Sequence, residues 1–105
     1  MQLTIFVTDD EPAIRNAIIQ RLTRKHHRVV GFESGDALLA ALPQEIPDLI
    51  LLDLKMPGLS GLETLKKLRP LAPHTLVILL TAYGTVQDAV DAMKLGAYDF
   101  LIKTV

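Results

Sequence analysis

Residues suited to phosphate or metal chemistry follow four of the five strand-like runs in this sequence. These residues are Asp9 and Asp10 after residues 3–8, Asp53 at the end of 49–53, Thr81 at the end of 76–81 and Lys103 at the end of 98–103. The remaining run, residues 29–33, ends in an ordinary Glu33. In open parallel sheets the functional crevice lies outside the carboxyl ends of the strands. We therefore expect three carboxylates, a hydroxyl and an amine to meet at one edge of a sheet.

The acids that follow the first run have two readings. A single Asp between a strand and a helix is at least as often a helix cap as a functional group. Only one of Asp9, Asp10 and Glu11 can be the cap, however, and the other two repel it. Mg2+ prefers carboxylate and carbonyl oxygens and keeps several waters, so one or two Asp side chains and a phosphate make a suitable site. The acids therefore predict a Mg2+ site, with helix capping as the alternative.

Asp53 ends a run that is otherwise wholly apolar, and the next helix does not begin until Ser60. Capping is therefore a poor explanation for this acid. Residues 54–61 are rich in turn formers, as is typical of a loop shaped around a site, although Met56 has an equally good reading as loop packing. Taken singly, Thr81 is interpreted as a structural residue at the end of a strand, and Lys103 as a solvated charged residue. As a set with Asp53 they supply the nucleophile, metal pocket, hydroxyl and cation that phosphoryl transfer uses.

Five short apolar runs alternate with amphipathic stretches, which predicts a parallel α/β domain. Residues 49–52 and 76–80 are continuously apolar, as expected for central strands covered on both faces. The first helix is expected from Pro12 to residues 24–25, whose basic side chains suit a helix C-terminus. Ser34 should cap the second helix, and Pro43 should end it.

Two further helices are expected in the second half of the chain. Ser60 and Glu63 form a capping box at the start of the third helix. The fourth begins at Thr85, and Gly96 ends it in the left-handed conformation. The buried stripe of the third helix is expected to consist of Leu62, Leu65 and Leu68, and the inner face of the fourth of Val86, Ala89, Val90 and Met93.

Composition limits the class of protein. A chain of 105 residues is one domain at most, and a net charge of -1 with a pI near 6.3 gives no basic excess for binding nucleic acid directly. There is no cysteine, no cleavable signal pattern and no apolar run long enough to cross a membrane. A cytoplasmic protein without a membrane partner is expected. The three histidines, His26, His27 and His74, are interpreted as surface residues.

Together, these motifs closely resemble the receiver domains of two-component response regulators. The matching residues are Asp9 and Asp10, then Asp53, Met56, Pro57 and Gly61 in the pattern D-x-x-M-P-x-x-x-G, then Thr81, Ala82, Gly96, Ala97 and residues 99–103. The resemblance covers the whole chain. Residues 81–86 and 89–94 are most similar to the receivers of nitrogen-regulation-type transcriptional activators.

The resemblance implies a flavodoxin-like, doubly wound parallel sheet of five strands in the order 2-1-3-4-5. It implies that Asp53 is the phosphoacceptor and that Asp10 and Asp53 ligate Mg2+, with Asp9 acting mainly through water. It further implies the following roles: the backbone carbonyl of Lys55 as a metal ligand, Lys103 and Thr81 as contacts to the phosphoryl group, and Phe100 as the aromatic switch residue.

The resemblance also implies the partners and the type of activity. A sensor histidine kinase or a small phosphodonor would supply the phosphoryl group. The phosphorylated chain would then regulate an output domain or a downstream regulator, with transcription as the expected output. The chain would assist its own phosphorylation and dephosphorylation without being an enzyme in the usual sense.

Two features depart from the family. Receivers usually have Pro after the lysine, often with a cis peptide bond, and this chain has Thr104. Because a non-proline cis bond costs about 3 kcal/mol, a trans loop that holds Lys103 less firmly is expected. The chain also ends at Val105, before the last helix of a receiver. Residues 1–105 are therefore interpreted as a truncated receiver, either a fragment or a natural short form, whose uncovered sheet face favours a homodimer or lower stability.

Three rival functions remain open. A metal-dependent phosphohydrolase that forms an aspartyl phosphate would use similar groups, but such enzymes resemble a D-x-D pattern, whereas residues 9–11 are contiguous acids. A nucleotide or flavin carrier shares the fold, yet no glycine-rich loop follows the first strand. An interaction module that works without phosphorylation would have no use for the three acids.

Overall fold

The computed structural model describes residues 1–82 and 84–103, and its five strands form one parallel sheet. The strands are β1 (Thr4–Thr8), β2 (Arg28–Phe32), β3 (Leu49–Asp53), β4 (Leu76–Thr81) and β5 (Asp99–Ile102). Their order is β2-β1-β3-β4-β5, which confirms the predicted flavodoxin-like topology. The two central strands, β3 and β4, have the predicted bounds. β1 begins one residue later than predicted, and β2 and β5 each differ from the prediction by one residue at both ends.

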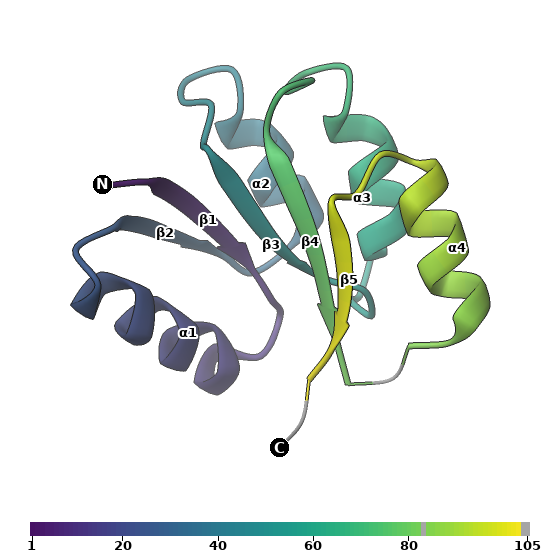
Figure 1. Cartoon of the computed structure of the whole chain (residues 1–105), viewed down its shortest axis with the longest axis horizontal. Helices are drawn as coiled ribbons and strands as arrows, with labels where there is room; N and C mark the ends of the chain where they lie inside the picture. The colour runs from purple at the N-terminus through teal and green to yellow at the C-terminus, as the bar shows by residue number, and fades with distance from the viewer. Residues whose placement is uncertain (83, 104–105) are drawn as a thin grey trace.

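Four helices cover the sheet in the described part of the chain. They are α1 (Pro12–Arg24), α2 (Gly35–Ala41), α3 (Gly61–Leu68) and α4 (Val86–Lys94). Figure 1 shows α1 on one face of the sheet and the other three helices on the opposite face. The side chains of Ser34, Ser60 and Thr85 cap α2, α3 and α4, as predicted. Gly96 follows α4 with a φ of 95°, which confirms its left-handed conformation.

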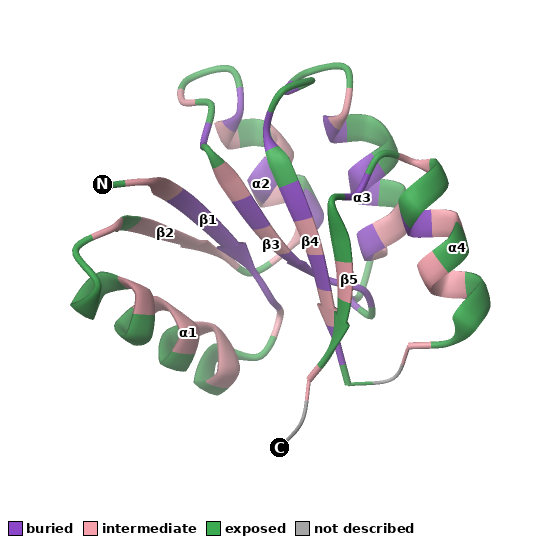
Figure 2. Cartoon of the chain, viewed as in Figure 1, coloured by how far each residue is buried: buried purple, intermediate pink, exposed green. Residues whose placement is uncertain are grey.

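The main core lies between the sheet and the layer formed by α2, α3 and α4. Its fully buried side chains include Leu38 of α2 and Leu42 directly after it, Ile50 and Leu52 of β3, Leu65 and Leu68 of α3, and Val77 and Leu79 of β4. In contrast, α1 contains no fully buried residue. Figure 2 shows this difference as buried positions on the central strands and α3, and only intermediate or exposed positions along α1.

The predicted inner face of α4 is wrong at three of its four residues, and only Ala89 is half-buried. Val86, Val90 and Met93 are 84%, 40% and 50% exposed, whereas Ala92 is completely buried. The helix has two apolar stripes, one of large residues and one of alanines, and their helical periodicity is the same. Packing against α3 and β5 selects the small stripe because alanines let the helix approach closely. The large apolar side chains therefore lie at the surface.

The histidines lie outside the strand ends, as expected, but they are not equivalent. His26 and His74 are exposed. His27 is half-buried, and its Nδ1 accepts a hydrogen bond from the backbone N–H of Leu3 at 3.0 Å. This contact ties the start of β1 to the segment before β2. Among the described helices, none has both the length and the apolar character needed to cross a bilayer.

Candidate functional site

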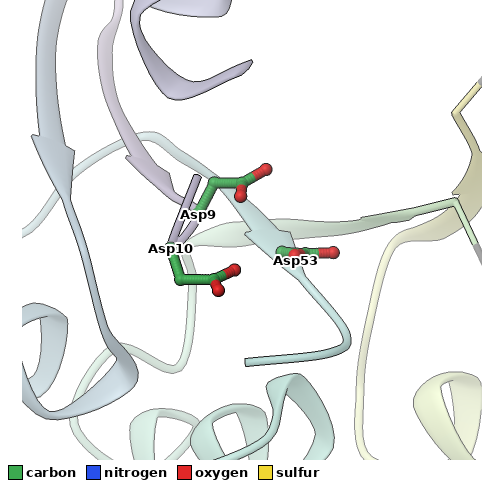
Figure 3. Close-up of side chains that lie close together, drawn as sticks. All are labelled: Asp9, Asp10 and Asp53. Atoms are coloured by element: carbon green, nitrogen blue, oxygen red, sulfur yellow. The ribbon is translucent and has the colours of Figure 1, made fainter. Parts of the chain in front are cut away.

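The sheet brings the three predicted acids together. Thr8 of β1 pairs with Leu52 of β3, so the residues that follow them, Asp9 and Asp53, lie side by side at the carboxyl edge. Carboxylate oxygens of Asp9, Asp10 and Asp53 all lie within 4.8 Å of one another. Figure 3 shows the three side chains directed into the same space. Three carboxylates this close repel each other unless cations lie among them.

Lys103 supplies one cation to this cluster. Its Nζ lies 2.7 Å from Oδ2 of Asp9 and 3.6 Å from Oδ1 of Asp53. The residue follows β5, and its backbone N–H donates to the carbonyl of Thr81 at 2.7 Å, which continues the pairing of β5 with β4. The lysine side chain is 15% exposed and that of Asp9 is 3% exposed. The geometry therefore places a largely buried ion pair beside Asp53. Thr104, whose effect on this loop was predicted, lies outside the described residues.

Asp9 and Asp10 have different surroundings. Oδ1 of Asp9 accepts the backbone N–H of Glu11 at 3.0 Å, and Oδ2 accepts Nζ of Lys103. Asp10 is half-buried, and within residues 1–82 and 84–103 its carboxylate accepts no hydrogen bond and forms no ion pair. Carboxylate oxygens without protein partners are suitable ligands for a hard cation such as Mg2+. Asp10 is thus the acid of the pair that is most available to a metal.

Helix capping does not explain these acids. The N-cap of α1 is Glu11, whose side chain makes no capping hydrogen bond. Asp9 accepts the N–H of Glu11 itself, not that of a residue inside the helix. The alternative reading of Asp9 and Asp10 as helix caps is therefore wrong.

Asp53 lies in a more enclosed position than Asp10. Its side chain is 10% exposed, and Oδ1 accepts the backbone N–H of Leu54 at 2.9 Å. Burial raises the pKa of the Asp53 carboxyl; Lys103 opposes this effect, and the negative charges of Asp9 and Asp10 add to it. The ionised carboxylate is therefore held in surroundings that disfavour its charge. A bound cation would relieve that cost.

The loop after β3 is held close to Asp53 by Gly61. A Cβ on this glycine would lie 2.3 Å from the backbone oxygen of Asp53 and 2.8 Å from Cα of Leu54. The backbone N–H of Gly61 also donates to the carbonyl of Leu54 at 2.8 Å. Met56 is only 9% exposed and joins the core, which supports its reading as loop packing. Lys55 lies in this loop two residues after Asp53, with an exposed side chain.

Thr81 lies on β4 and Phe100 on β5, the last two strands in the order of the sheet. Thr81 ends β4, is 1% exposed and pairs with Ile102 of β5. Phe100 pairs with Leu79, and its half-buried ring lies so close to Gly84 that a Cβ there would be 2.7 Å from two ring carbons. The ring thus lies against Gly84, two residues before α4.

One residue of the site was missed by the sequence reasoning. Nη1 of Arg15 in α1 donates to the backbone carbonyl of Asp9 at 2.7 Å. A signal was present, because Arg15 places a positive charge near the N-terminus of a helix, where the helix dipole disfavours it. Such a placement suggests that the side chain has a specific partner.

Comparison with known proteins agrees with this geometry. Residues 5–105 match the family model described as the response regulator receiver domain. The chain is 38% identical over 103 residues to the response regulator protein FleR of Pseudomonas aeruginosa, covering 98% of this chain and 22% of FleR. It is 37% identical over 99 residues to the DNA-binding transcriptional regulator NtrC of Salmonella typhimurium, covering 94% of this chain and 21% of NtrC. The chain therefore spans about a fifth of the length of each relative.

A solved structure also resembles the fold closely. It is a response regulator protein from Burkholderia pseudomallei that contains a phosphorylated aspartic acid, a calcium ion and citrate. The TM-score is 0.92 and the sequence identity 28%, covering 97% of this chain and 60% of that one. The relatives confirm the predicted similarity to receivers of the nitrogen-regulation type. The sheet order, the acidic cluster and the family match lead to one conclusion: the chain belongs to the response regulator receiver domain family.

Proposed function

We propose that this chain is a phosphorylation-operated switch in which Asp53 accepts a phosphoryl group. The observation that carries the proposal is the position of its carboxylate, largely enclosed, beside two further acids and 3.6 Å from the ammonium of Lys103. A phosphohistidine of a sensor kinase, or a small phosphodonor, is the proposed donor. Asp53 shares the site with groups that suit charge neutralisation, on which phosphoryl transfer mainly depends.

The transfer proceeds in line. A carboxylate oxygen of Asp53 forms a bond to phosphorus while the bond between phosphorus and the donor's imidazole nitrogen breaks, and that nitrogen keeps the electron pair. The ammonium of Lys103 offsets the negative charge of the phosphoryl group as it reaches Asp53. The backbone N–H of Leu54 holds Oδ1 of Asp53 in place, so Oδ2 is the proposed nucleophile.

Mg2+ is the proposed cofactor, and the chemistry of the donor set fits it. Asp10 and Asp53 would supply carboxylate oxygens to the ion. The backbone carbonyl of Lys55 would be a third protein ligand, and Asp9 would contribute mainly through water because its Oδ2 already accepts Lys103. When bound, Mg2+ neutralises charge on the phosphoryl oxygens and orients them. The fold of the chain brings the carboxylate oxygens of Asp9, Asp10 and Asp53 together before the ion binds.

The switch follows from the added charge. A phosphoryl group on Asp53 brings about 1.5 to 2 negative charges and three acceptor oxygens. We propose that the Thr81 hydroxyl moves to bind one of these oxygens and that Phe100 turns into the space it leaves. The surface formed by α4 and β5 would change shape as a result.

The output is proposed from the relatives. FleR is described as a response regulator and NtrC as a DNA-binding transcriptional regulator, and this chain matches about a fifth of each. We propose that residues 1–105 are the receiver part of a cytoplasmic regulator of transcription and do not contact DNA themselves.

Intact-mass spectrometry after incubation with Mg2+ and a small phosphodonor tests this function. The protein should gain one phosphoryl group, and Asp53→Asn should gain none. Asp36→Asn, which removes an exposed acid of α2, is the matched control and should behave like the wild type. Equal labelling of Asp53→Asn and the wild type would contradict the proposal.

A further inference from the structure

In the described part of the chain, the charged side chain of Arg15 binds the backbone and not a carboxylate. Its guanidinium donates to a backbone carbonyl, that of Asp9, although Asp10 and Glu11 lie nearby in the sequence. Within residues 1–82 and 84–103 it forms no ion pair with a carboxylate. A charged donor on a carbonyl makes a stronger hydrogen bond than a neutral one. The contact therefore fixes the turn between β1 and α1 more firmly than helix packing alone would.

Gly31 makes the reach of Arg15 possible. A Cβ on Gly31 of β2 would lie 3.2 Å from Cδ of Arg15 and 2.7 Å from Cδ1 of Ile19. The absence of a side chain at this position lets α1 lie close to β2 and lets the arginine stem pass across the strand. The neighbouring residue of β2, Phe32, accepts the backbone N–H of Asp9 at 3.1 Å. The turn is thus held from both α1 and β2.

Asp9 is consequently bound at all four of its polar groups. Its N–H donates to Phe32, its carbonyl accepts Arg15, and its carboxylate accepts Glu11 and Lys103. The carbonyl of Asp9 and the N–H of Asp10 belong to one planar peptide unit. Holding that carbonyl therefore sets the direction in which the chain enters Asp10, the acid without an internal partner.

We propose that Arg15 is a positioning residue that orients Asp10 for the cation, through the carbonyl of Asp9. The inference rests on the proposed function, because it assumes that Mg2+ binds at the acidic cluster. Residues that hold metal ligands in place typically change metal affinity by about 10-fold to 100-fold when they are replaced. Arg15 would act in this way without contacting the ion.

The charge of Arg15 has the opposite effect, which makes the inference testable. A positive charge near the site repels Mg2+, so removing it would strengthen metal binding if charge were all that mattered. If positioning matters more, the loss of the hydrogen bond weakens binding despite the lost repulsion. Arg15→Met removes both the charge and the donor, whereas Arg15→Lys keeps the charge and loses the reach of the guanidinium.

Calorimetric titration of the whole chain with Mg2+, in the absence of a phosphodonor, distinguishes these cases. Arg15→Met and Arg15→Lys should each bind Mg2+ about tenfold more weakly than the wild type. Arg21→Met, on the same helix with an exposed side chain, is the matched control and should bind as the wild type does. Gly31→Ala, which crowds the arginine stem, should weaken Mg2+ binding in the same direction.

Thermal melts without Mg2+ separate positioning from a purely structural role. A structural role alone would lower the melting temperature of the Arg15 variants and leave the Mg2+ dissociation constant unchanged. Affinities within twofold of the wild type in both variants, or tighter binding by Arg15→Met, would overturn the inference while the wild type still binds Mg2+. If Arg15→Met does not fold, Arg15→Lys decides the question by the same criterion. Absence of Mg2+ binding by the wild type would instead contradict the proposed metal site itself.

Discussion

The ends of β1 and β3 carry acids that lie side by side but are held differently. At the end of β1, every polar group of Asp9 has a partner, including the buried ammonium of Lys103. At the end of β3, Asp53 has one backbone donor and a more distant lysine, and burial raises its pKa. The difference separates two tasks. We propose that the β1 end forms a fixed frame and that the β3 end presents the carboxylate that reacts.

Replacement of Lys103, which pairs with Asp9 at the end of β1, is expected to have the largest effect on stability. Lys103→Met leaves the buried Asp9 carboxylate without its cation, and breaking such a pair typically costs about 3 to 5 kcal/mol. Chemical denaturation without Mg2+ should show this loss, and Mg2+ should restore more stability to the variant than it adds to the wild type. Lys66→Met, which removes an exposed lysine of α3, is the control and should change little.

The same Lys103 variant should still bind Mg2+ and accept a phosphoryl group, but should transmit phosphorylation poorly. The reason is that the ammonium contacts the phosphoryl group in the proposed mechanism. Amide resonances of α4 and β5 in NMR spectra report the response. Phosphorylation-dependent shifts as large as those of the wild type would remove Lys103 from the mechanism.

Gly61 tests how closely the β3 end depends on its loop. Gly61→Ala places a methyl group against the backbone of Asp53 and Leu54, and overpacking of this kind costs about 1 to 3 kcal/mol. Gly58→Ala is the comparison, because a Cβ at Gly58 would meet no other atom of the described residues. The only expected cost is that of placing alanine at the positive φ of 77°, about 1 kcal/mol. The Gly61 variant should also be phosphorylated more slowly. A Gly61→Ala protein with wild-type stability and rate would show that the loop is not constrained at this point.

Mg2+ should stabilise the fold through Asp10. At a concentration 100 times the dissociation constant, a ligand adds about 2.7 kcal/mol to the free energy of unfolding. For a domain of this size that raises the melting temperature by roughly 10 °C or more. In Asp10→Ala most of this rise should disappear, because the unpaired carboxylate is gone. An unchanged Mg2+ response in that variant would place the metal elsewhere.

The raised pKa of Asp53 predicts the smallest effect, a pH-dependent cost of folding. Between the ordinary Asp pKa and the raised pKa, the folded state binds more protons than the unfolded state, so the free energy of unfolding falls as pH rises through this window. Asp53→Asn removes the cost. Without Mg2+, the variant should gain melting temperature over the wild type, and the gain should be absent at acid pH and grow toward neutral pH. A gain that is constant with pH would contradict burial as the cause.

Local features of this fold were predictable from the sequence, and features that depend on packing were not. β3 and β4 were predicted with correct bounds because each is a continuous apolar run up to its last residue. The caps at Ser34, Ser60 and Thr85 were predicted because capping involves only neighbouring residues. The inner face of α4 was missed because its two apolar stripes have the same periodicity and only contact with the rest of the fold chooses between them.

The candidate site shows the same division. The meeting of Asp9, Asp10 and Asp53 was predicted, because the carboxyl ends of parallel strands meet at one edge. The binding of Lys103 by Asp9, and the contact of Arg15 with the Asp9 carbonyl, were not predicted. Both depend on side-chain paths across elements far apart in the sequence, which no local pattern records.

Chemical mapping of the phosphorylated residue tests most directly whether Asp53, and not the fixed acid beside it, reacts. Borohydride reduces an aspartyl phosphate to homoserine, which peptide mass spectrometry locates. After incubation with Mg2+ and a small phosphodonor, homoserine should appear at position 53 only, and positions 9 and 10 should remain aspartate. Homoserine at position 9 or 10 in the wild type would contradict the division of tasks between the two strand ends.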